Sequence, residues 1–505
     1  PYEGFILVNA METIVYPRIL EERSGQGFYT LLVNEEITIS LLKATPFAKD
    51  MVIVDDDGGN IHHSKQTLST TSGEVYKDSE NYSAVIISFN DGLRVKGILQ
   101  HKFIIEPIQA ESPKAPVIPH RISPMKSHPT DKLYNEKAAI SKNISGIFQE
   151  RWLAEEKQDA EQPGPQIVTL KVGIIISQSY IVQFKKSNYS EINEVMDYLA
   201  VFFSFANIFL EKLDKRALDL QLRVYNIAVL KKSTESFIEY YENRRDVIAG
   251  SSLKKLNDFV ESKPEHFKRT DVVVYISSFP IATHNANGIT NVFASGYAIV
   301  GGACSASRSI LIQDNPKTYQ GVLTAVHEIF HLLGCVHDGQ SAPEQLSYSP
   351  GATSCPGDEA TVMAPDMTSH RELRISDCTQ AQVMAFLMSP QGRCLRAKTK
   401  RHRRKIIESR IKAALLNIQI YCYRLVGKEE GITIVPNVDK NNLQNCYLGC
   451  TWKDQTHEHY DFLVAPDYTP CAFVGNKVTK VCMHTKCTAL PTDLYTFPKN
   501  IKTDI

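Results

Sequence analysis

Three histidines lie close together in the sequence, at positions 327, 331 and 337. His327 and His331 are four residues apart, so a helix places both imidazoles on one face. Gly334 can adopt a backbone conformation that other residues avoid, so we expect it to end the helix and bring His337 round as a third ligand. Three protein ligands leave one coordination position of zinc open, which is typical of a catalytic site. The sequence therefore predicts one catalytic Zn²⁺ ion.

The residues around these histidines extend the pattern. Glu328 follows the first histidine, so its carboxylate is expected beside the metal, where it can accept the proton of a water that attacks a peptide carbonyl. Asp338 follows the third histidine, and Met363 stands in the segment 361–365, which is expected to form a tight methionine turn below the zinc. His-Glu-x-x-His alone arises by chance in unrelated helices, but the longer pattern rarely does. The sequence predicts peptide hydrolysis with Glu328 as general base.

The elements that position these residues can be predicted from hydrophobic periodicity. Near-continuous apolar runs predict buried strands, and apolar residues at helical spacing predict helices between them. The expected strands are 167–176, 220–229, 271–276, 292–300 and 309–312, and the expected helices are 192–210, 253–260 and the histidine helix. Because strands and helices alternate, the fold class is α/β with a mixed, mostly parallel five-stranded sheet.

The 505 residues are too many for one ordinary core. Residues 1 to about 105 contain strand patterns at 36–40 and 84–88, and the stretch up to 165 is rich in Pro, Ser, Lys and His, as in a linker. We predict a strand-rich N-terminal part with its linker, a catalytic domain, a basic linker and a cysteine-rich domain, spanning 1–165, 166–398, 399–420 and 421–505.

Charge and cysteine usage narrow the class of protein. Acidic and basic residues balance at 56 each, which excludes a typical nucleic-acid binder. All 11 cysteines lie between Cys304 and Cys487 at irregular spacings, as expected for disulfides in a secreted protein. The most apolar segment, 198–210, is too short to span a bilayer. We expect a secreted, extracellular monomer without a membrane span.

The extended zinc motif, with His-Asp at positions 337–338, resembles the reprolysin (adamalysin) branch of the metzincin metalloproteases. Further stretches similar to that family are 15–23, 296–304, 374–378 and 394–395. The start of the chain and the short six-cysteine tail look most like tick salivary metalloproteases. This resemblance implies a metzincin catalytic domain, a prodomain in residues 1–165, and protein substrates such as host matrix or clotting proteins. It also implies a substrate-binding edge strand made of Gly296, Tyr297, Ala298, Ile299 and Val300.

The resemblance further implies two disulfides, Cys304–Cys394 and Cys355–Cys378. Cys335 is left over and is interpreted as a buried free thiol, while the tail cysteines allow 15 connectivities.

The sequence also departs from the family. No cysteine precedes residue 304, so a thiolate cannot block the zinc from the prodomain. His120, His128 or Asp131 could do so instead, and steric blockage would also suffice. Ala397 replaces a common calcium ligand, so no calcium is expected there.

Three activities fit these observations. An active endopeptidase is favoured because Glu328 is present. A binding protein that uses the protease fold and the cysteine-rich tail without cleavage is the alternative, and an exopeptidase is a third possibility. The basic tetrapeptide 401–404 fits the pattern cut by furin-type convertases, but it equally fits a solvated linker.

Overall fold

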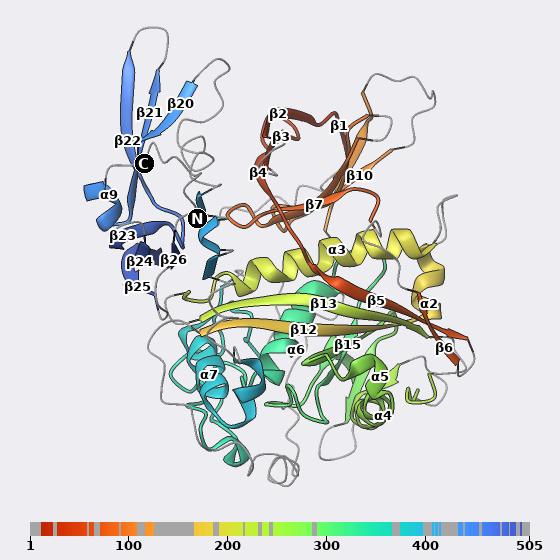
Figure 1. Cartoon of the computed structure of the whole chain (residues 1–505). Helices are drawn as coiled ribbons and strands as arrows, with labels where there is room; N and C mark the ends of the chain where they lie inside the picture. The colour runs from red at the N-terminus through yellow and green to blue at the C-terminus, as the bar shows by residue number, and fades with distance from the viewer. Residues whose placement is uncertain are drawn as a thin grey trace, which may run out of the picture. The chain divides into compact units, whose positions relative to one another are not determined.

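The computed structural model divides into two compact units (Figure 1). The first contains residues 1–151, 169–212 and 221–395, and the second contains 152–168, 213–220 and 396–505. The structure describes residues 12–23, 28–57, 60–64, 71–89, 92–108, 117–125, 166–184, 191–215, 218–230, 235–241, 246–284, 290–365, 374–396, 407–408, 410–412, 414–415, 433–437, 440–453, 457–474, 477–483, 485–490 and 495–496. The tetrapeptide 401–404 and Ala397, about which predictions were made, lie outside these residues.

The N-terminal part of the first unit is a nine-stranded antiparallel sheet in the order β1-β11-β10-β9-β8-β7-β4-β3-β2. Its strands are β1 (Thr13–Val15), β2 (Arg18–Arg23), β3 (Phe28–Leu32), β4 (Thr38–Lys43), β7 (Glu74–Asp78), β8 (Ser83–Ser88), β9 (Arg94–Leu99), β10 (Phe103–Pro107) and β11 (His120–Pro124). Alternate residues of β4, Ile39 and Leu41, are fully buried, as the period of a strand requires. The strand patterns at 36–40 and 84–88 are confirmed by β4 and β8.

The catalytic part contains a seven-stranded mixed sheet in the order β18-β19-β15-β12-β13-β5-β6. Its strands are β5 (Phe47–Asp57), β6 (Asn60–Ser64), β12 (Gln166–Ser177), β13 (Leu218–Leu230), β15 (Val272–Ser277), β18 (Gly296–Tyr297) and β19 (Ser309–Gln313). Strand β15 is parallel to both β12 and β19, whereas β18 is antiparallel to β19. The expected five strands account only for those after residue 165, because β5 and β6 come from the N-terminal part.

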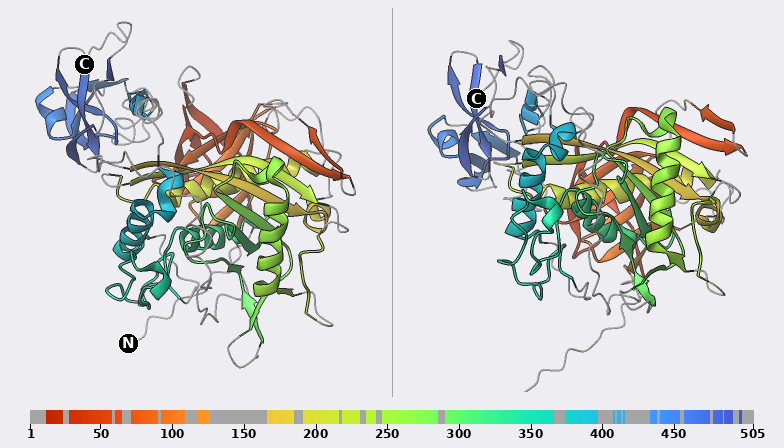
Figure 2. Two further views of the ribbon diagram at one scale, coloured as in Figure 1. Left: turned by 60° about the horizontal axis from the view of Figure 1, so that its bottom comes forward. Right: turned by 90° about the horizontal axis from the view of Figure 1, so that it is seen from below.

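Helices cover both faces of this sheet. They are α2 (Gln178–Ile181), α3 (Glu191–Leu210), α4 (Ala249–Ser262), α5 (Pro264–Phe267), α6 (Gly321–Leu332) and α7 (Asp377–Met388), with short 3₁₀ segments η1 (Val182–Phe184), η2 (Glu344–Leu346) and η3 (Gln391–Leu395). Figure 1 shows α3 between this sheet and the N-terminal strands, with α4 on the opposite face, and in Figure 2, where the bottom of that view comes forward, α4 lies in front of the sheet. A small sheet of β14 (Val247–Ile248), β16 (Ile281–His284) and β17 (Thr290–Ala294) lies beside them.

Helix α3 is apolar along most of its length. Its stretch Ile192–Leu210 is long and apolar enough to cross a membrane. This stretch is longer than the segment 198–210 considered from the sequence. However, 78% of the most apolar window is buried inside the first unit. Packing between two sheets therefore accounts for its composition.

The second unit holds the cysteine-rich part. Its described elements are β20 (Thr433–Asn437), α9 (Lys440–Gln444), β21 (Tyr447–Lys453), β22 (Glu458–Val464), β23 (Pro470–Val474), β24 (Lys477–Met483), β25 (Lys486–Ala489) and β26 (Tyr495–Thr496). Disulfides join Cys446 to Cys482 and Cys471 to Cys487. A small core with this few strands depends on such cross-links.

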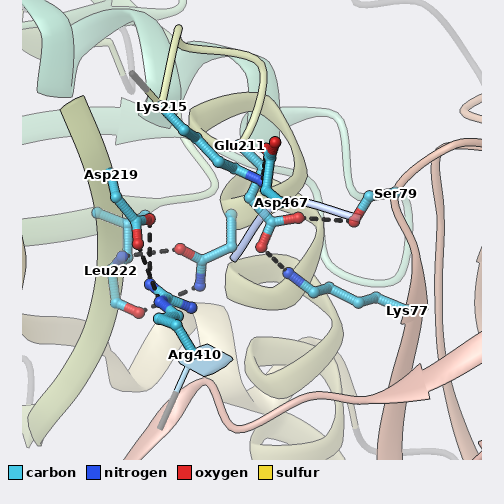
Figure 3. A network of polar contacts seen from close by, with 9 residues as sticks. Lys77, Ser79, Glu211, Lys215, Asp219, Leu222, Arg410 and Asp467 are labelled. Atoms are coloured by element: carbon cyan, nitrogen blue, oxygen red, sulfur yellow. Dashed lines mark hydrogen bonds and ion pairs between the residues drawn. The ribbon is translucent and has the colours of Figure 1, made fainter. Parts of the chain in front are cut away.

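The segment 399–420 is not simply a linker. Within its described residues, Ile407, Ile411 and Ala414 are buried in a cluster with Tyr468 and other apolar residues of the second unit. The Arg410 guanidinium pairs with the buried Asp219 carboxylate (Figure 3). The same carboxylate accepts a hydrogen bond from the Tyr468 hydroxyl (2.8 Å). Arg410 of this basic stretch therefore helps to hold the segment within the second unit.

Candidate active site

The three histidines converge on one point inside the first unit. The Nε2 atom of His337 lies 3.1 Å from that of His327 and 3.2 Å from that of His331, and all three side chains are buried. Tetrahedral coordination with Zn–N bonds of 2.0–2.1 Å would separate the nitrogens by about 3.3 Å. The spacing therefore fits the edges of a zinc tetrahedron.

Backbone carbonyls fix which ring nitrogens of His327 and His331 face the point of convergence. The Nδ1 atom of His327 lies 2.7 Å from the Val362 carbonyl oxygen, and that of His331 lies 2.7 Å from the Cys335 carbonyl oxygen. Each Nδ1 must carry a proton to donate to its carbonyl, so each Nε2 is left with a lone pair. Lone pairs that face one another repel unless a cation lies between them, so these residues fit a bound Zn²⁺ ion.

The helix and turn around the ligands follow the expected local path. Helix α6 ends at Leu332, and Gly334 has a φ of +90°, a value that side chains with a Cβ rarely adopt. A Cβ on Gly334 would also come within 3.2 Å of Phe386. The chain can therefore turn back sharply enough to bring His337 to the other two ligands.

Burial shifts the pKa of His331 and that of the neighbouring Cys335 thiol. Removal from water lowers the pKa of His331 to about 4, so its imidazole is neutral at physiological pH, as metal binding requires. Burial raises the pKa of Cys335 well above its usual value, so this cysteine stays a thiol. Its sulfur lies 3.6 Å from the Thr379 carbonyl oxygen. The interpretation of Cys335 as a buried free thiol is confirmed.

Asp338 and Met363 connect segments next to the three histidines. The backbone N–H of Asp338 donates to the Met363 carbonyl oxygen (2.9 Å), and Met363 is fully buried. The Asp338 carboxylate accepts hydrogen bonds from the Thr361 and Ser376 hydroxyls. Asp338 thus ties the turn after the third ligand to the methionine segment and to the start of α7.

Thr361 and Ser376 were not singled out from the sequence. Ser376 is the N-cap of α7, and its side chain accepts from the Thr379 N–H (3.1 Å). A Ser followed by Asp at the start of an apolar helical pattern is a readable signal for this role. Nothing in the local sequence marks Thr361, because its partner is set by the fold.

Glu328 projects from α6 toward the edge strand. Its side chain is buried, and its Oε1 atom lies 2.5 Å from the position that a Cβ on Gly296 would take. Strand β18 is the end strand of the seven-stranded sheet, and no described strand pairs with its outer side. It is shorter than expected, because the strand covers only Gly296 and Tyr297, and of Ala298, Ile299 and Val300 only Ile299 forms a single β-bridge.

Other expected residues are also placed. Disulfides join Cys304 to Cys394 and Cys355 to Cys378, the pairs that the resemblance implied.

His120 does not serve as a zinc-blocking residue in this structure. It lies in the core of the nine-stranded sheet, where its Nε2 accepts from the Val95 N–H (2.9 Å) and its Nδ1 donates to the Ile118 carbonyl oxygen (2.9 Å). With both nitrogens engaged, no lone pair is left for a metal. The alternatives His128 and Asp131 lie outside the described residues.

Comparison with known proteins agrees with this geometry. Residues 166–376 match the reprolysin profile of metallopeptidase family M12. The chain is similar to the venom metalloproteinase BumaMPs1 of Olivierus martensii, with 23% identity over 358 residues (69% of this chain and 86% of the relative). It is also similar to the antarease-like venom metalloproteinase TtrivMP_A of Tityus trivittatus, with 23% identity over 398 residues (76% and 92%).

A shorter stretch of 132 residues is 31% identical to a Bombyx mori protein named as like a disintegrin and metalloproteinase with thrombospondin motifs (25% of this chain and 19% of the relative). The 358 residues aligned with the first relative exceed the span 166–376, so the likeness continues outside the protease segment. Residues 166–376 thus match the reprolysin metallopeptidases of family M12, and the protein is a zinc metalloendopeptidase.

Proposed function

We propose that the protein is secreted and cleaves extracellular or plasma proteins within their chains. The observation that carries this proposal is the convergence of three imidazole Nε2 atoms beside a buried carboxylate that faces the edge strand. We assign His327, His331 and His337 as the ligands of one zinc ion and Glu328 as the general base.

In this mechanism a bound zinc ion supplies Lewis-acid activation of water and of the scissile carbonyl. The Glu328 carboxylate accepts a proton from the water as its oxygen bonds to the carbonyl carbon. Glu328 then gives that proton to the amide nitrogen as the C–N bond breaks. His327 and His331 keep their orientation because their Nδ1–H groups remain bonded to backbone carbonyls.

Action within a chain is supported by the position of β18. An extended peptide can add to the outer side of an end strand through main-chain hydrogen bonds and continue past the site in both directions. Gly296 carries no side chain, so a peptide paired there can lie close to Glu328. An exopeptidase would need a group that binds a chain terminus, and none of the assigned residues has that role.

Secretion and extracellular substrates are supported by two observations. Four disulfides are described, which favours an oxidising compartment, and two of the relatives reported above are named as venom metalloproteinases. The likeness of residues 15–23 and the tail to tick salivary enzymes suggests matrix or clotting proteins as substrates. We further propose that residues 1–165 form a prodomain that blocks the site without a thiolate.

Replacement of the general base tests this proposal. Glu328→Ala should retain one equivalent of zinc by metal analysis but lose about 10²- to 10⁴-fold in kcat on an unstructured peptide. Chelation should abolish wild-type cleavage, and added Zn²⁺ should restore it. Glu344→Ala, which removes an exposed carboxylate of the same domain, is the matched control and should cleave normally. Normal cleavage by Glu328→Ala would contradict the assignment.

A further inference from the structure

The hairpin β5–β6 leaves the N-terminal sheet and joins the catalytic sheet. Strand β5 runs parallel to β13, with Val52, Ile53 and Val54 opposite Asn226, Ile227 and Ala228, and β6 pairs antiparallel with β5 on its outer side. In Figure 1 the β5 ribbon runs alongside β13 across the catalytic sheet. Two of the seven strands of the protease sheet are therefore supplied from residues 47–64.

This pairing is an internal part of the catalytic core. Val54 is buried within the hydrophobic cluster beneath α4, together with Ile175, Ala228 and Leu256. Ile53 is also buried, on the same strand. If β5 were absent, these apolar neighbours and one side of the β13 ladder would face water, which is unfavourable for both groups.

A second set of contacts joins α3 to the N-terminal sheet. The buried Asp197 carboxylate accepts hydrogen bonds from the backbone N–H and the hydroxyl of Ser72, both at 2.7 Å. Near the end of α3, Glu211 pairs with the Lys77 ammonium and accepts from the Ser79 hydroxyl (2.7 Å) (Figure 3). Buried groups of this kind lose their partners if the two parts separate.

These contacts lie away from the substrate strand. The order of the sheet places β5 and β6 at one edge and β18, beside Glu328, at the other. Occupation of the β13 edge therefore does not occupy the outer side of β18.

From this arrangement we propose that residues 12–125 are a permanent subunit of the protease. When the chain is cut anywhere between residues 126 and 165, the N-terminal piece stays bound through β5 and α3, and the active enzyme contains both pieces. If residues 1–165 inhibit the uncut chain, as proposed above, cutting must relieve that inhibition without departure of the N-terminal sheet. A chain that starts near Gln166 lacks two sheet strands and should aggregate.

The test uses the full chain with residues 140–146 replaced by the recognition sequence of a site-specific endopeptidase. After complete cutting, verified on a denaturing gel, the two pieces should co-elute in native size-exclusion chromatography, and peptidase activity should elute with both. Separation of the pieces in plain buffer would overturn the proposal. Activity found only with a fragment free of the N-terminal piece would do the same.

Two variants of β5 test whether the buried pairing of this strand with β13 holds the two pieces together. Val54→Ala removes buried methyl groups and should speed dissociation of the cut pieces about tenfold or more. Asp50→Ala, on the same strand, removes only an exposed ion pair with Arg269 and should change that rate by less than about threefold. Equal rates for the two variants would show that β5 does not hold the pieces together. Because dissociation is measured, this result does not depend on the assignment of Glu328.

Discussion

At the scale of single residues, the site depends on a position that has no side chain. A Cβ on Gly296 would lie 2.5 Å from Oε1 and 2.7 Å from Cγ of Glu328, and 2.6 Å from Cγ2 of Thr324. Contacts this short cannot persist, so a neighbour must move. Thr324 and Glu328 both belong to the buried helix α6, so relief of both contacts requires the edge strand and the helix to move apart. Glu328 would be displaced from the edge strand by this movement.

Gly296→Ala should accordingly fold and bind zinc but lose about 10²-fold in kcat, because displacement of a catalytic group by about 1 Å has an effect of this size. Zinc content, thermal unfolding and a separation of kcat from KM check this. Gly250→Ala is the matched control, since no atom lies within 4 Å of its added Cβ. A rise in KM alone would show that Gly296 serves substrate pairing and not the position of Glu328.

At the scale of elements, the catalytic helix is anchored at its start by a buried carboxylate. Asp314 accepts hydrogen bonds from the Gly321 N–H (2.8 Å) and from the hydroxyls of Tyr180 and Tyr198. The Tyr198 hydroxyl in turn accepts from the Tyr319 N–H (2.8 Å). Burial raises the pKa of Asp314 to about 6, so the carboxylate is mainly ionised at pH 7.5 and can accept all three bonds.

Asp314→Asn should lower the stability of the protease unit by about 1–3 kcal/mol at pH 7.5, because an amide nitrogen in place of Oδ2 cannot accept the hydrogen bonds that both tyrosine hydroxyls donate there. Thermal unfolding measures this, and Tyr180→Phe, which removes a single donor, should have a smaller effect. The ionisation of Asp314 also changes stability in a definite direction. Since the folded pKa exceeds the ordinary value of 3.8, ionisation of Asp314 reduces stability as pH rises through 6, and the variant should lack this dependence. An unchanged melting temperature would contradict the anchoring role.

At the scale of the whole molecule, the N-terminal sheet shares a compact unit with the protease, so its stability affects the enzyme. Burial lowers the pKa of His120 from 6.5 to about 4. Between these values the unfolded chain binds a proton that the folded sheet excludes. The stabilising contribution of neutral His120 is therefore present above pH 6.5 and is lost as pH falls toward 4.

His120→Gln should reduce the pH dependence of unfolding in this window by roughly 3 kcal/mol at most, since a glutamine carbonyl can still accept from the Val95 N–H. Unfolding midpoints in urea at pH 7.5 and 4.5 measure the change. His331 has the same direction of shift, so only the difference between wild type and variant is informative. Parallel pH profiles for the two proteins would exclude His120 as the source.

The sequence alone predicted the zinc ligands and the general base that we propose, and the alternation of strands and helices around them. These features are local: one helix and the turn after it present His327, Glu328, His331 and His337, and periodicity shows which faces are buried. The tertiary structure decided what depends on distant partners. His120 lies in a sheet core, the strand at Gly296 has only two residues, and β5 pairs with the edge of β13. Each of these features depends on a buried polar group or an open sheet edge that lies nearby in space but far away in the chain. The sequence alone does not show such neighbours.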